Sequence, residues 1–286
     1  MMNPAFDQQL NAIFTLLSDR DEKTVDLVRQ TLIDIGPDVV PSLERAKTDA
    51  APHIRGQLQT VVEQIRQNDL ESRFREYACG EDAELDLEDG CLLTAEFCYP
   101  GLNWADSHLE LDRIADEISG RLVRKNRPEE IIHRINRHLF TELGFHGNTQ
   151  DYYNPDNSYL NRVLDRRTGI PISLSVVYLL VAKRLGLPIS GIGLPGHFML
   201  KYEREDGGLF LDPFHQGQIL TRDECIRFLL NSGYEVQSGH FASATVRDIL
   251  TRMLRNLVYA YSQLKDKEKA HRVTRLLHIL QSTAQG

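Results

Sequence analysis

A predicted β-hairpin at residues 196–212 decides the fold of this chain. Its first half is GHFMLKY (196–202), whose side chains alternate between two faces as a strand requires. The turn-rich stretch EREDGG (203–208) follows, and LFLD (209–212) is a second short strand that stops at Pro213. The pattern therefore predicts two antiparallel strands joined by a polar turn.

The register of this hairpin decides which side chains meet. Pairing Tyr202 with Leu209 follows from the position of the turn. Asp212 then lies opposite Met199, and His197 lies diagonally beside Asp212, roughly 7 Å away before the side chains extend. A slip of one residue would put the histidine and the aspartate on opposite faces of the sheet.

An aspartate beside a histidine has two interpretations. In acyl-transfer enzymes with a thiol or serine nucleophile, the carboxylate fixes the tautomer of the imidazole and raises its basicity. Asp212 would do this for His197. The alternative is structural, because a buried histidine needs a hydrogen-bond partner and an aspartate in a hairpin can supply one. The sequence leaves both interpretations open.

The residues around the hairpin carry a family resemblance. The run DYYNPDNSYLNRVLDRRTGIPISLSVVYLLVAKRLGLPISGIGLPGHFMLKY (151–202), followed by LFLDPFHQG (209–217), closely resembles the SirB-type transglutaminase-like proteins. Looser similarity runs from about Ala95 to the C-terminus. The resemblance implies a divergent transglutaminase core with a tetratricopeptide-like tail, and a similar core occurs in a eukaryotic F-box protein.

This resemblance implies a papain-like triad, in which a cysteine begins a helix and a histidine and an aspartate follow on adjacent strands. The helix is predicted at Pro171–Leu185, because Pro171 suits a first turn and Gly186 suits the position after a helix end. Counting back from the Gly-x-Pro after the helix puts the nucleophile position on or near Pro171. No cysteine lies between Cys98 and Cys225, so the expected thiol is missing.

Two serines offer the nearest hydroxyl groups. Ser175 follows Pro171 by four residues and shares its helix face, about one turn or roughly 6 Å deeper. Ser173 is turned about 200° away from Pro171. Packing or a hydrogen bond to the helix backbone explains both serines without chemistry. Neither serine lies at the exposed start of the helix, where the helix N-terminus would lower the pKa of a nucleophile most.

A polar and aromatic loop precedes this helix. Its residues Tyr153, Asn154 and Asn157 could line a groove beside His197, together with Pro171 at the helix start. The alternative is an ordered loop whose side chains cap backbone groups and begin the next helix.

Composition bounds the remaining possibilities. The chain has 286 residues and a net charge of −8, with no basic block that would indicate nucleic-acid binding. It has no apolar run near 18 residues and no N-terminal signal pattern, which predicts a cytoplasmic protein without membrane contact. Four cysteines without a CxxC pair predict reduced thiols. The ten histidines form no HExxH set, so neither a metal nor a cofactor is expected.

Helical segments flank the predicted core. Residues 1–68 carry apolar stripes that predict two helix pairs, which resemble HEAT-type repeats. Residues 69–240 form the expected transglutaminase-like core. Residues 241–286 predict a helical hairpin with tetratricopeptide-like spacing, and the single unit is too short to form a complete peptide-binding groove.

The fold expected from these patterns is a helix-rich α+β protein with a papain-like core and a small antiparallel sheet. Two function classes follow. The first is a non-catalytic binding, adaptor or regulatory protein with a protein or peptide partner, which the missing cysteine and the flanking repeats favour. The second is an acyl transferase or an amide or ester hydrolase that uses His197 and Asp212, with Ser175, Ser173 or water as nucleophile. Neither the partner nor the oligomeric state follows from the sequence.

Overall fold

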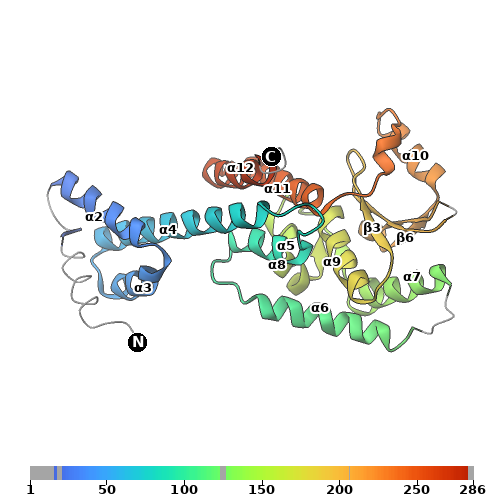
Figure 1. The fold of residues 1–286 in the computed structure, drawn as a ribbon, viewed down its shortest axis with the longest axis horizontal. Coiled ribbons are helices and arrows are strands. Elements are labelled where there is room, and N and C mark those ends of the chain that lie inside the picture. The colour runs from blue at the N-terminus through green and yellow to red at the C-terminus, as the bar shows by residue number, and fades with distance from the viewer. Residues whose placement is uncertain (1–15, 18–20, 123–126, 206, 283–286) are drawn as a thin grey trace. The chain divides into compact units, whose positions relative to one another are not determined.

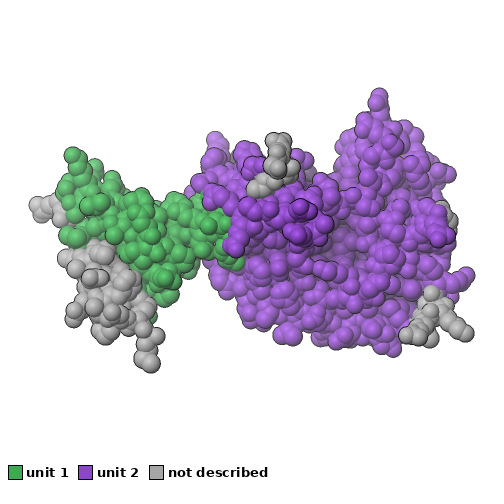
Figure 2. Space-filling view, viewed as in Figure 1, with its two compact units in different colours: residues 1–73 green, residues 74–286 purple. Residues whose placement is uncertain are grey.

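The computed structural model describes residues 16–17, 21–122, 127–205 and 207–282. The chain divides into two compact units, Met1–Arg73 and Phe74–Gly286 (Figure 2). Each unit has its own buried core of apolar side chains.

The first unit is helical. It contains α2 (Glu22–Ile35), the 3-10 turn η1 (Pro37–Val39), α3 (Val40–Asp49) and most of α4 (Pro52–Ala78). The Asp21 side chain caps α2, which ends at Gly36 with a φ of 80°. Buried aliphatic residues from the three helices form one core. The helix predicted around residues 10–17 lies almost wholly outside the described residues, and the HEAT-like assignment remains a prediction.

The last helix of this segment is longer than the sequence pattern indicated. We expected helical structure to pause near Asn68, but α4 continues to Ala78. The reason is that Leu70, Phe74 and Ala78 extend a buried face at four-residue spacing, and no glycine or proline follows Gly56 within the helix.

The second unit surrounds a central helix, α9 (Pro171–Arg184), whose residues 171–182 are all buried (Figure 1). A helix that is apolar all round belongs in a core. It ends as predicted, because Gly186 has a φ of 65° and the N–H of Leu187 donates to the carbonyl of Ala182. The other helices before it are α5 (Leu87–Glu96), α6 (Trp104–Ser119), α7 (Pro128–Asn136), the π-helical η2 (Arg137–Glu142) and α8 (Leu160–Arg166).

A four-stranded antiparallel sheet packs against α9. Its strands follow chain order: β3 (Ile189–Ile192), β4 (Met199–Tyr202), β5 (Leu209–Asp212) and β6 (Gln218–Leu220). Two shorter strands, β1 (His146–Gly147) and β2 (Thr168–Gly169), pair in parallel. The small antiparallel sheet of the expected fold class is therefore present.

The predicted hairpin register is confirmed, since Tyr202 pairs with Leu209. The predicted start of the first strand is wrong, because β4 begins at Met199 and not at Gly196. Gly196 has a φ of 74°, and the N–H of His197 donates to the carbonyl of Leu194. His197 therefore lies in a turn just before the strand.

The C-terminal segment contains α10 (Arg222–Asn231), the 3-10 turn η5 (Ser238–Phe241), α11 (Val246–Gln263) and α12 (Lys267–Ser282). Helices α11 and α12 pack against each other, and Lys265, at a φ of 59°, lies in the turn between them. Helix α11 packs against α5 and α9 as well as α12, so the hairpin belongs to the second unit. Within the described residues, no helix has the length and apolar content needed to span a bilayer.

Candidate functional site

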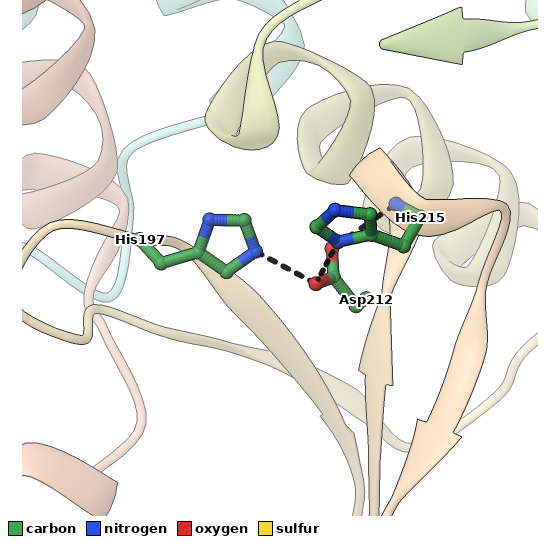
Figure 3. A group of neighbouring side chains, drawn as sticks. All are labelled: His197, Asp212 and His215. Atoms are coloured by element: carbon green, nitrogen blue, oxygen red, sulfur yellow. Dashed lines mark hydrogen bonds and ion pairs between the residues drawn. The ribbon is translucent and has the colours of Figure 1, made fainter. Parts of the chain in front are cut away.

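His197 and Asp212 form a hydrogen bond, as the hairpin register predicts. The Nε2 atom of His197 lies 2.8 Å from Oδ2 of Asp212 (Figure 3). Both side chains are buried, with His197 at 7% and Asp212 at 3% relative exposure. Because the carboxylate accepts, the ring hydrogen is assigned to Nε2. Nδ1 of His197 makes no hydrogen bond with the described part of the chain and is the nitrogen left for a ligand or a proton.

The fold holds the Asp212 carboxylate in place. Asp212 ends β5 and caps the 3-10 turn η4 (Pro213–His215), where its Oδ1 atom accepts from the backbone N–H groups of Phe214 at 3.0 Å and His215 at 3.3 Å. Burial on its own raises the pKa of this carboxyl. Hydrogen bonding and charge attraction from His197, and then from His215, outweigh burial, so the pKa of Asp212 lies below its ordinary value.

A second histidine completes the cluster, and sequence reasoning missed it. Nδ1 of His215 lies 2.7 Å from Oδ2 of Asp212, the same oxygen that His197 contacts (Figure 3). The His215 side chain is 61% exposed, so the cluster opens to solvent on this side. The signal was available, because in Asp-Pro-Phe-His the proline begins a tight turn that brings the first and fourth residues together.

Aromatic side chains pack against the His197 side of the cluster. The ring centroid of Phe228 on α10 lies 5.5 Å from that of His197, and the ring of Phe214 lies 6.2 Å from it. Phe214 also packs on Tyr152, at 6.2 Å between centroids. These rings exclude water from one side of the imidazole and strengthen electrostatic interactions there.

The expected nucleophile side of the site is apolar and internally bonded. Pro171 is buried. The Ser173 hydroxyl donates to the carbonyl of Asn157 at 2.5 Å and accepts the N–H of Ile170 at 3.0 Å. The Ser175 hydroxyl is completely buried and has no hydrogen-bond partner in the described chain. Among the described residues, no hydroxyl or thiol group hydrogen-bonds to the His197 imidazole.

The four cysteines are free thiols. Cys225 on α10 is fully buried, with its Sγ atom 3.7 Å from the sulfur of Met199. Burial raises the pKa of the Cys225 thiol to about 12, and the carboxylates of Glu224 and Asp212 add to this effect. Burial also raises the pKa of Cys91. A thiol is nucleophilic as the thiolate, so neither buried cysteine is activated.

The predicted groove residues separate into two groups. Tyr153 is 46% exposed, and its ring packs 5.1 Å from that of Tyr259 on α11. Asn154 caps the 3-10 turn η3 (Pro155–Asn157) by accepting the N–H of Asp156. Asn157 has no exposed surface and donates to the carbonyls of residues 151 and 152. Asn157 and Pro171 are buried and therefore do not line an exposed groove.

The cluster also has the donor set of a cation site. Nε2 or Nδ1 of His197, a carboxylate oxygen of Asp212 and a ring nitrogen of His215 all lie within 4.8 Å of one another. Two imidazoles and one carboxylate suit a first-row transition ion such as zinc. The sequence pattern did not indicate this site, because its ligands come from two separate segments.

Comparison with known protein families gives the class of this protein. Residues 105–255 match the sequence profile of the Transglutaminase-like superfamily. This match covers more than half of the chain, and the chain belongs to that superfamily. The transglutaminase-like part of the sequence resemblance is thereby confirmed, while its SirB-type assignment and the tetratricopeptide-like tail remain predictions.

Individual relatives narrow the comparison. The chain is 38% identical over 224 residues to a UPF0162 protein of Xylella fastidiosa (strain 9a5c), a match that covers 74% of this chain and 76% of the relative. It is 32% identical over 148 residues to a UPF0162 protein of Vibrio cholerae, covering 50% and 54%. It is 38% identical over 137 residues to F-box only protein 21 of Mus musculus, covering 45% of this chain and 21% of that one. No solved structure matches the chain.

Proposed function

We propose that this protein is a non-catalytic binding or adaptor protein that uses its transglutaminase-like domain to recognise a protein or peptide. The observation that carries this proposal is the absence, among the described residues, of a hydroxyl or thiol group bonded to His197. The Ser173 hydroxyl hydrogen-bonds to backbone groups, and the Ser175 hydroxyl is buried in the core. An imidazole–carboxylate pair without an adjacent nucleophile lacks the group that forms a covalent intermediate.

A surface of half-exposed tyrosines supports the binding role. Tyr152, Tyr153, Tyr234 and Tyr259 are 38–51% exposed, and we call them the tyrosine surface. Tyr153 packs against both Tyr152 and Tyr259. The ring of Phe214 packs on Tyr152 and on His197 and so links these three tyrosines to the site. Tyrosines carry much of the binding energy at protein interfaces, since each offers a large rigid area and a polar tip.

Arg252 adds a charge beside the tyrosine surface. Its guanidinium donates to the carbonyl of Leu194 at 2.7 Å and lies over the ring of Phe198. No carboxylate of the described chain forms an ion pair with it, and burial lowers its pKa. A half-buried arginine without an acidic partner favours a ligand that brings a carboxylate.

Binding is tested by photo-crosslinking of the intact protein. A photoreactive amino acid at position 259 should trap one defined partner from a bacterial lysate, and Tyr153→Ser or Arg252→Met should reduce that product by about tenfold or more, as for an interface anchor. Leu109→Ser is the matched control, because Leu109 is 66% exposed and lies on α6. Equal trapping in all variants would reject the tyrosine surface as the binding site.

The second candidate function is hydrolysis of an amide or ester. The short His197–Asp212 bond favours it, because Nδ1 of His197 is left to accept a proton from Ser175, Ser173 or water. A screen of acyl substrates with the wild type, His197→Ala and Ser175→Ala decides between the two functions. We expect no turnover. Robust wild-type turnover that is lost in both variants would overturn the binding proposal and identify the nucleophile.

A further inference from the structure

We propose that His197, Asp212 and His215 form a binding site for a divalent first-row transition ion, with zinc as the reference ion. This inference does not depend on the proposed binding function. The two imidazoles approach one oxygen of Asp212 from separate segments, at 2.8 Å and 2.7 Å. A single hydrogen bond would be enough to orient His197. The second imidazole has no such role to fill, but it completes a ligand set of two nitrogens and one oxygen.

The present geometry is close to what an ion needs. Around tetrahedral zinc, ligand atoms lie about 2 Å from the ion and therefore about 3.3 Å from one another. The two nitrogen–oxygen pairs here are 2.8 Å and 2.7 Å apart, so each imidazole must retreat by about half an ångström. His215 can do so readily, because its side chain is 61% exposed. The ring hydrogens that now point to Asp212 would shift to the other nitrogen of each ring, so that His197 Nε2 and His215 Nδ1 bind the ion through their lone pairs.

The carboxylate has the support that metal ligands usually have. Oδ1 of Asp212 is held by two backbone N–H groups, which leaves Oδ2 aimed between the imidazoles (Figure 3). Hydrogen bonds to a ligating carboxylate orient it and raise the affinity of the site. The strand β5 and the turn η4 fix this part of the backbone, so the site is organised before an ion arrives.

The surroundings favour an ion with an open position. Phe214 and Phe228 shield the His197 side of the cluster, and the exposed His215 leaves an entry path from solvent. Three protein ligands leave at least one position for water or for a group of a bound partner. Such an ion would supply a Lewis acid beside the tyrosine surface.

Metal binding itself tests the inference. The intact chain carries Cys79→Ser, which removes the exposed thiol, and is stripped of metal. It is then titrated with Zn²⁺ by calorimetry and with Co²⁺ by absorption spectroscopy. We expect one equivalent to bind, with Co²⁺ d–d bands and without sulfur charge-transfer bands. His215→Ala should weaken binding by about a hundredfold, because it removes a ligand and leaves the His197–Asp212 bond intact.

The control variant is His271→Ala, because His271 is exposed on α12, and this change should leave the affinity unaltered. His215→Gln keeps a polar side chain and provides a second test if His215→Ala perturbs folding, which circular dichroism detects. Absence of stoichiometric binding in the wild type would overturn the inference, as would equal affinities in the wild type and both His215 variants. If the photoreactive residue at position 259 traps no partner while the metal still binds, the result would count only against the proposed function.

Discussion

The two halves of the expected papain-like site differ in what their polar groups do. On the sheet side, His197 and His215 converge on Asp212, and the cluster reaches solvent through His215. On the helix side, Ser173 bonds inward and Ser175 has no partner in the described chain. A polar residue at the expected position in a family pattern is therefore not yet a functional group. Its hydrogen bonds decide whether it is available to a ligand.

Removal of the Asp212 carboxylate should destabilise the protein more than any change on the helix side. Asp212→Ala removes a buried carboxylate that accepts from two imidazoles and two backbone N–H groups, and it leaves the buried His197 without this partner. We expect a loss of about 3 kcal/mol in the free energy of unfolding, measured by urea denaturation. Asp165→Ala is the control, since its carboxylate is 65% exposed in a surface pair. A loss as small as that of the control would show that the cluster does not stabilise the fold.

The two serines on α9 should respond differently to the same change. Ser173→Ala breaks the bonds to Asn157 and Ile170 and should cost about 1–2 kcal/mol. Ser175→Ala removes a buried hydroxyl that has no partner in the described chain and should be neutral or stabilising by up to about 1 kcal/mol. Equal destabilisation of both variants in denaturant titrations would remove the distinction between them.

Acidification should weaken the sheet side of the site. The pKa of Asp212 lies below the ordinary value of 3.8 in the folded protein. Its contribution to stability is therefore present above the unfolded value and is lost as the pH falls through the lower folded value. The difference in unfolding free energy between the wild type and Asp212→Asn should stay constant from about pH 7 to about pH 5 and shrink from there to about pH 3. A difference in unfolding free energy that stays constant down to about pH 3 would contradict a stabilising ionised carboxylate at Asp212.

Thiol modification should have the smallest effect. Cys79 is exposed, whereas Cys91 and Cys225 are buried with raised pKa values. Brief alkylation of the native protein should label Cys79 first and leave Cys91 and Cys225 intact, as peptide mass spectrometry can show. Crosslinking through the tyrosine surface should be unchanged by this label. Rapid labelling of Cys225 without unfolding would reopen the possibility of a reactive thiol near Asp212.

Local rules predicted much of this architecture. The hairpin register followed from alternation and a polar turn, and the ends of α9 followed from Pro171 and Gly186. The predicted start of β4 was wrong because Gly196, at a positive φ, forms a turn just before His197. The alternation of side chains does not reveal this turn. His215 was missed although the Asp-Pro-Phe-His turn, which folds it back onto Asp212, is a local feature of the sequence.

Residue types and their spacing were enough to predict a helix-rich chain with a transglutaminase-like core and without a cysteine at the start of the central helix. Those features depend on residue type and short-range spacing, which a chain carries before it folds. The availability of each polar group to a ligand became clear from the folded chain. The inward bonds of Ser173, the isolation of Ser175 and the meeting of His197 with His215 arise from segments brought together by packing. Burial and direction are properties of the folded core, so no local pattern could have determined them.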